Sequence, residues 1–163
     1  MKLKRVVVTG LGALTPLGNT VSEFWDGLAS GKSGAAPITR FDASKFKTRF
    51  ACEVKNFDPG TILDRKEARK LDLFSQFGLA AAIQAIDDSG VVTHSSFNAD
   101  RVGVIWAAGI GGLRTFWDEA SAFNKGDGTP RFNPFFIPKM IIDIASGHIS
   151  IRYGLRGPNY ATV

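Results

Sequence analysis

Two short apolar runs constrain the fold of this chain most strongly. Residues 5–9 contain three successive valines, and residues 101–107 carry valine, isoleucine and tryptophan at neighbouring positions. Strands that are apolar on both faces are typical of parallel sheets, in which helices cover each face. The two runs therefore predict an α/β fold with buried strands and helices on both sides.

Three segments carry the patterns of helices. Thr20 and Glu23 form a capping box, and the apolar residues of 21–31 recur at helical spacing, so we expect this helix to pack on the first strand. Residues 71–89 are apolar around most of the helix circumference but carry a stripe of glycine and alanine. This stripe predicts a central helix that another backbone approaches closely. Residues 139–153 predict a third helix, closed by a glycine.

The remaining segments predict loops and one more strand. Residues 33–60 predict a loop with a small edge hairpin, and residues 154–158 predict a glycine- and proline-rich turn into a strand at 159–163. No turn residues or polar tail follow Val163, so we expect the chain to be part of a longer protein, cut within a strand. Its length fits one domain, residues 1–163.

Composition narrows the classes of function. Lysine and arginine number 20 against 15 acidic residues, which favours an acidic partner. The single cysteine, Cys52, excludes an internal disulfide and suits a reducing compartment. Glycine, threonine and proline interrupt the N-terminal apolar run, which disfavours a secretory signal, and no other segment has the length and apolarity of a membrane span. We therefore expect a soluble cytoplasmic protein.

Most candidate catalytic residues have a structural interpretation. Residues 10–12 begin a dinucleotide-binding pattern, but Thr15 stands where the third glycine belongs. Cys52 has no activating neighbour, so it is expected to be a small buried apolar residue. His94 is expected in solvent and His148 in the core or an interface, and no second ligand lies at metal-binding distance in the sequence.

Three other segments can bind or position a partner. The glycines of 109–112 predict a tight turn or a close approach, without the lysine that a phosphate-binding loop requires. Residues 131–138 are aromatic and contain two prolines, which is typical of an interface or a pocket wall. Lys66, Arg69 and Lys70 share one face of a capped helical turn, either as a solvated surface or as a binding surface.

Taken together, these segments resemble the N-terminal part of a β-ketoacyl-acyl carrier protein synthase, most closely the type II enzymes of bacterial fatty acid synthesis. The resemblance runs along the whole chain, in order, and only the first part of such an enzyme is covered. It is carried by Val6–Gly12, Pro16–Asn19, Arg65–Glu67, Ala108–Gly112, Asn133–Pro138 and Gly147–Pro158.

The resemblance implies a thiolase-like fold, of which this chain is the N-terminal portion of a layered αβαβα core, and a homodimer. Family members load an acyl group from acyl carrier protein onto a cysteine and decarboxylate malonyl-carrier protein to form the attacking carbanion, and two histidines stabilise the developing charges. The resemblance implies no cofactor or metal and no nucleic-acid or membrane partner. The nucleophilic cysteine is expected just past Val163 and the histidines further downstream, so Cys52, His94 and His148 receive no catalytic role.

Within this chain the resemblance implies supporting roles. Ile110 matches the residue that gates the acyl pocket, and Phe136 with Ile137 matches a segment that lines the acyl tunnel near the dimer interface. Phe132 stands where a further basic residue is found in the family. Four residues match positions that dock the acidic carrier protein: Lys66, Arg69, Lys70 and Arg131.

Two related interpretations stay open at this point. The chain can belong to a chain-length-factor-like partner subunit without the cysteine, or to a ketosynthase domain of a polyketide system. The residue at the nucleophile position, a few places after Val163, separates the first alternative from an enzyme: cysteine indicates the enzyme and glutamine the partner. Acyl preference is not determined, and this chain alone is expected to be inactive in condensation.

Overall fold

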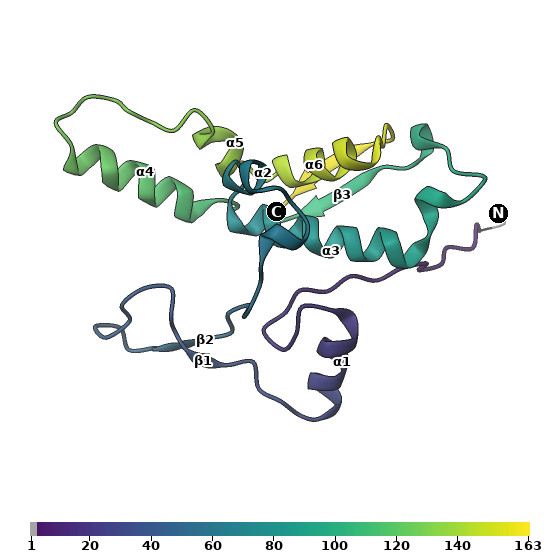
Figure 1. Ribbon diagram of the computed structural model, residues 1–163, viewed down its shortest axis with the longest axis horizontal. Coiled ribbons are helices and arrows are strands. Elements are labelled where there is room, and N and C mark those ends of the chain that lie inside the picture. Colours follow the sequence, from purple (N-terminus) through teal and green to yellow (C-terminus); the bar gives the residue numbers. More distant parts are fainter. Residues whose placement is uncertain (1–2) are drawn as a thin grey trace.

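A computed structural model describes residues 3–163, in which helices and short strands are mixed (Figure 1). This mixture confirms the predicted α/β class. The helices are α1 (Val21–Ala29), α2 (Arg65–Arg69), α3 (Leu73–Ser89), α4 (Leu113–Lys125), α5 (Phe136–Met140) and α6 (Ile144–Tyr153). The strands are β1 (Ala36–Pro37), β2 (Phe50–Ala51), β3 (Val104–Ala107) and β4 (Asn159–Thr162). Single 3₁₀ turns are η1 (Pro59–Thr61), η2 (Val91–Thr93) and η3 (Ala99–Arg101).

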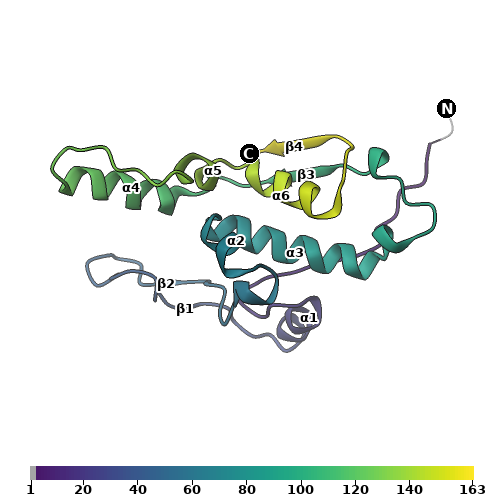
Figure 2. The same cartoon turned by 45° about the horizontal axis from the view of Figure 1, so that its top comes forward.

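The parallel pair of strands β3 and β4 forms the centre of the fold. Val104 pairs with Asn159 and Ala107 pairs with Thr162, which confirms two of the predicted strands. The expectation that helices bury both faces of β3 is wrong within the described residues: Ile105 is 80% exposed, because α3 and α6 pack on the face that carries Val104 and Trp106. Helix α6 contacts both strands, and helix α3 packs on α6 (Figure 2). The buried apolar side chains of this core are Leu63, Leu71, Leu79, Val104 and Ile149.

Helix α3 is the central helix that the sequence predicts. A Cβ added at Gly78 would overlap the ring of Trp106 on β3. On another side of the helix, a Cβ added at Gly12 would overlap the carbonyl of Ala81, and Gly10 meets the next turn in the same way. The small residues of α3 therefore allow the Trp106 side chain on one side and the backbone of residues 10–12 on another to lie in van der Waals contact with the helix. This is the close approach that the sequence predicts.

Residues 5–9 are extended but form no strand within the described residues, so the prediction of a buried strand there is wrong. Val6 is 90% exposed. A strand needs a neighbouring strand to satisfy its backbone groups, whereas the described segment beside this one is helix α3, whose backbone groups bond within the helix. Helix α3 binds the segment through a side chain instead: Asp88 accepts a hydrogen bond from the Leu11 N–H at 2.9 Å.

Helix α1 begins as predicted but packs differently. The Thr20 hydroxyl accepts from the Glu23 N–H at 3.2 Å, as a capping box requires. The buried Gly27 faces Leu17 in the preceding loop, and Trp25 is 67% exposed. The expectation that α1 packs on the first strand is therefore wrong, because the loop before the helix occupies its buried side.

The C-terminal half differs from the predicted elements at two places. The helix expected over 139–153 is divided into α5 and α6, because Ile141 has an extended backbone with ψ 144°. Gly154, with φ 64°, closes α6 as expected. Helix α4 is not among the elements expected from the sequence. The edge hairpin expected within 33–60 is confirmed as the antiparallel pair β1 and β2.

The close approach at Gly12 leads to a first prediction. In the full-length protein, Gly12→Ala should lower the free energy of unfolding by about 1–3 kcal/mol, because its methyl group would meet the Ala81 carbonyl and force the segment away from α3. Urea unfolding measures the change. Gly147→Ala is the control, since an added Cβ there meets no atom within 4 Å in the described structure. Equal effects of the two substitutions would contradict the packing described here.

Candidate functional site

Helix α2 displays the three basic residues singled out in the sequence. The Asp64 carboxylate caps the helix, accepting from the Lys66 N–H at 2.7 Å and the Glu67 N–H at 2.9 Å. Lys66, Arg69 and Lys70 are exposed, and among residues 3–163 none of the three forms an ion pair within 4.0 Å. We call these three residues the docking cluster. It places three cations, without an ion pair among the described residues, on a short helix and its C-cap.

The fourth predicted docking residue lies in a separate segment. Arg131 is in the loop between α4 and α5 and pairs with Asp127 at 3.3 Å, with both side chains largely exposed. No hydrogen bond or ion pair within the described chain joins Arg131 to α2. Because Asp127 partly neutralises the charge of Arg131, the positive potential around Arg131 is weaker than that around the docking cluster.

The glycine-rich turn at 109–112 connects strand β3 to helix α4, and we call it the gate turn. Gly111 has φ 79°, in the left-handed region that favours glycine. The Gly112 N–H donates to the Met140 carbonyl at 2.9 Å, which fastens the turn to the end of α5. Ile110, the predicted gate residue, is 68% exposed at the tip of this turn.

Ile110 lines a mainly apolar cavity of about 380 Å³ beside the gate turn. Phe116 of α4 lines the same cavity and also stacks on Phe136, with ring centroids 6.3 Å apart. Phe136 in turn stacks on Phe132 at 5.8 Å. The predicted gate and tunnel-wall residues are thus connected through Phe116, whereas Ile137 is 52% exposed and outside the cavity lining.

Phe116 is the residue of this group that sequence reasoning missed. It lies on α4, where Leu113, Phe116 and Trp117 recur at the spacing of one helical face. That spacing is the signal that could have identified both the helix and its aromatic contact with the segment 131–138.

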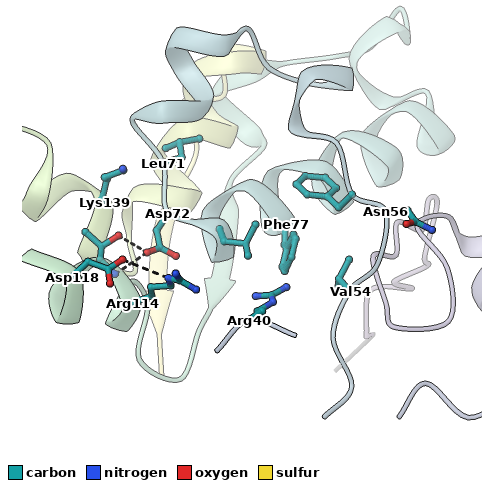
Figure 3. A pocket seen from close by; sticks show the side chains of 12 residues that line it. Arg40, Val54, Asn56, Leu71, Asp72, Phe77, Arg114, Asp118 and Lys139 are labelled. Atoms are coloured by element: carbon teal, nitrogen blue, oxygen red, sulfur yellow. Dashed lines mark hydrogen bonds and ion pairs between the residues drawn. The ribbon is translucent and has the colours of Figure 1, made fainter. Parts of the chain in front are cut away.

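A larger, open cavity of about 510 Å³ lies between the start of α3, helix α4 and the loop before α2 (Figure 3). Asp72 and the ion pair of Arg114 with Asp118, at 3.5 Å, lie along one side of it (Figure 3). The Arg40 guanidinium carbon lies 5.8 Å from the ring centroid of Phe77, and both residues also line the cavity. The cavity mixes both signs of charge, so it does not favour a simple anion site.

The loop that leads into β4 is held at several points. The Arg156 Nε donates to Asp100 at 2.6 Å, and this charged bond lowers the pKa of the Asp100 carboxyl. The Asn159 side chain donates to the Ser150 hydroxyl at 2.7 Å. These contacts determine the direction in which strand β4 leaves the loop.

The cysteine and the histidines do not form a catalytic group. Cys52 is exposed, which corrects the expectation of burial, because it follows the two-residue strand β2 of an uncovered hairpin. His94 is exposed as expected, and His148 is half-buried on α6. Within residues 3–163 no three metal-ligating side chains gather at one place. None of the helices over the same residues has the length and apolarity to cross a bilayer.

Comparison with known proteins decides the family. The model of the family described as "Beta-ketoacyl synthase, N-terminal domain" matches residues 3–163. The chain belongs to the β-ketoacyl synthase family. It is 50% identical over 163 residues to 3-oxoacyl-[acyl-carrier-protein] synthase 2 of Coxiella burnetii, and 48% identical to the enzyme of the same name from Synechocystis. Both alignments cover 100% of this chain and 39% of the relative, so the chain spans about two-fifths of their length.

Solved ketosynthase structures have the same fold. The ishigamide ketosynthase/chain length factor matches with a TM-score of 0.83 and 28% identity, over 96% of this chain and 39% of that one. A β-ketoacyl synthase from Burkholderia phymatum matches with a TM-score of 0.76 over 96% of this chain and 38% of that one, and at 23% identity it bears on the fold alone. These matches confirm the predicted family and the N-terminal ketosynthase fold.

The surroundings of His148 lead to a second prediction. Burial lowers the pKa of His148. The negative charge of Glu67 raises this pKa to a smaller extent, and the positive charge of Lys70 lowers it further. Protonation is then harder in the folded state than in the unfolded state, whose histidine pKa is about 6.5. The neutral form of His148 therefore costs the folded state nothing above pH 6.5. The free energy of unfolding should fall as the pH drops from 6.5 toward the lower pKa of the folded state.

His148→Gln should remove this part of the pH dependence from the full-length protein, and urea midpoints between neutral and mildly acidic pH measure it. His94→Gln is the matched control, because His94 is exposed. Identical pH profiles for wild type and His148→Gln would show that His148 does not titrate differently on folding.

Proposed function

We propose that the protein to which this chain belongs is a β-ketoacyl-[acyl carrier protein] synthase of fatty acid biosynthesis. The observation that carries the proposal is 42–50% identity to proteins named 3-oxoacyl-[acyl-carrier-protein] synthase 2, along 98–100% of this chain. The reaction is a decarboxylative Claisen condensation. A cysteine thiolate displaces the carrier thiol from an acyl thioester, and malonyl-carrier protein then loses CO₂ to form an enolate. The enolate attacks the acyl-enzyme, giving β-ketoacyl-carrier protein and the free cysteine.

The strand geometry supports a nucleophile directly after β4. Strands β3 and β4 are parallel, and the Ala108 N–H donates to the Thr162 carbonyl at 3.3 Å. The carboxyl ends of neighbouring parallel strands lie at the same edge of a sheet. A cysteine that follows Val163 would therefore emerge beside the gate turn and Ile110.

The docking cluster provides the surface for the acidic carrier protein. Lys66, Arg69 and Lys70 combine positive charge with exposure, which attracts an acidic partner and accelerates encounter. Arg131 is a second docking residue in this proposal, with a smaller contribution because of its pair with Asp127. One similar fold, AntDE:AntF, is described as a type II polyketide acyl-carrier protein in complex with its ketosynthase.

The acyl chain is proposed to pass Ile110 and to contact Phe136 and Ile137. The connection of Ile110 to Phe136 through Phe116 supports a continuous apolar path. We also propose a homodimer that acts in the cytoplasm without a metal or cofactor of its own. The apolar side chains exposed on α4, such as Trp117 at 70%, are consistent with coverage by another subunit or another part of the protein.

A chain-length-factor-like partner subunit is the second candidate function. The likeness to the ishigamide ketosynthase/chain length factor favours it, although at 28% identity this match is weaker than those to the fatty acid enzymes. Sequencing through the nucleophile position and assaying the full-length protein with acyl- and malonyl-carrier protein separates the two. Cysteine with condensation supports the enzyme, and glutamine without condensation supports the partner.

Docking is tested by charge reversal. In the full-length synthase, Lys66→Glu with Lys70→Glu should raise KM for carrier protein by about tenfold, and more at low salt, where surface charges are least screened. Lys45→Glu with Lys47→Glu changes the net charge equally on two other exposed lysines, and it should leave this KM nearly unchanged. Equal effects of the two pairs would indicate a general charge effect and contradict docking on α2.

A further inference from the structure

We propose that Asp72 is a positioning residue that couples the docking cluster to the gate turn. This inference rests on the proposed function, in which carrier protein docks on α2 and Ile110 controls entry of the acyl chain. Carrier docking and acyl entry are then linked by one carboxylate, so that the gate turn responds to the position of α2.

Asp72 follows Lys70 of the docking cluster after one intervening residue, Leu71, and contacts two helices. Its Oδ1 accepts from the Phe74 N–H at 3.3 Å and caps α3. Its Oδ2 accepts from the Thr115 N–H at 3.3 Å and also from the Thr115 hydroxyl. These bonds join residues 43 positions apart in the sequence. Asp72 is therefore the link from the segment after α2 to the start of α4.

Helix α4 depends on Asp72 for a cap. Gly112 occupies its N-cap position and has no side chain to accept a hydrogen bond. A carboxylate at a helix N-terminus also interacts favourably with the helix dipole. Because the gate turn ends at Gly112, the residue that caps α4 also holds one end of the gate turn.

The gate turn is enclosed between Asp72 and α5. A Cβ added at Gly112 would lie 3.2 Å from the Asp72 Oδ2 and 2.8 Å from the Met140 Cα. The Gly112 N–H donates to the Met140 carbonyl on the α5 side. The turn has little space to move unless Asp72 or α5 moves as well.

A second contact connects the docking cluster with α5. The Lys70 ammonium lies 5.4 Å from the ring centroid of Phe135, immediately before α5. Lys70 thus contacts the residue before α5, and Asp72 contacts the start of α4; the gate turn is held between these two helices. A carrier protein that draws Lys70 toward its acidic surface would weaken the contact with Phe135, and Asp72 would keep the α4 side in place.

Thr115→Val in the full-length synthase tests the coupling. Valine matches threonine in shape but removes the hydroxyl donor, and it leaves the charge of Asp72 and the docking cluster intact. The ratio of kcat/KM for long over short acyl-carrier substrates should change by about tenfold, as expected for one hydrogen bond to a charged group. The salt dependence of KM for carrier protein should stay at its wild-type value, because the charges of the docking cluster are intact, and Thr115→Ser should restore the ratio.

The control is Thr93→Val, which removes an exposed hydroxyl that donates to the Gly90 carbonyl at 3.0 Å on η2. It should leave the ratio unchanged. If Thr115→Val folds poorly, Asp72→Asn tests the same link, because asparagine still caps α3 but carries no charge. It should change the ratio in the same direction.

A loss of activity that is equal for all acyl lengths indicates a structural role only and overturns the proposal, and so does an unchanged ratio. Failure of docking on α2 is a separate result. It would appear as an unchanged carrier KM in the Lys66→Glu, Lys70→Glu protein, which the ratio measured with Thr115→Val does not report.

Discussion

The close packing of three segments against helix α3 is the constraint on which the described structure depends. Gly78 admits the Trp106 ring from β3, and Gly12 allows the N-terminal segment to lie against the Ala81 carbonyl. Helix α6 covers a further side through Ile149 and Leu79. A larger residue at any of these contacts would separate the layers, since protein interiors leave few voids and accept little added volume. The docking cluster and the gate turn keep their relative positions because both are attached to this helix or to the strand packed on it.

The parallel pairing of β3 with β4 concentrates the functional elements at one edge. The gate turn follows β3, the predicted nucleophile follows β4, and α5 closes the turn from the side through Met140. The docking cluster reaches the same edge through Asp72 and Lys70. A short ladder of strand pairs thus brings together the proposed docking surface, the proposed gate and the expected catalytic position, which are distant in the sequence.

Local patterns predicted the elements whose stability is local or whose partners are present in the chain. The cap of α1, the left-handed glycine that closes α6 and the two paired strands follow from residue type and spacing. The prediction of a strand at residues 5–9 failed because a strand needs a pairing partner, and the described residues provide none. The three valines are nevertheless of the type found in buried strands. The predicted third helix was divided at Ile141, since the bond from Gly112 to Met140 fixes the end of α5 by a contact that no local pattern encodes. Cys52 was expected in the core, but burial depends on what covers the hairpin.

By itself, the sequence determined the class of fold and the family, and it predicted which residues dock a carrier protein and gate the acyl pocket, because motif order and apolar periodicity are properties of the chain alone. Only the tertiary structure decided which of these residues lie together. It joined Ile110 to Phe136 through Phe116, paired Arg131 with Asp127 and placed Asp72 between α3 and α4. The physical reason is that the first and last of these contacts join residues tens of positions apart, and their geometry depends on how the helices pack around α3 rather than on the residues that flank them.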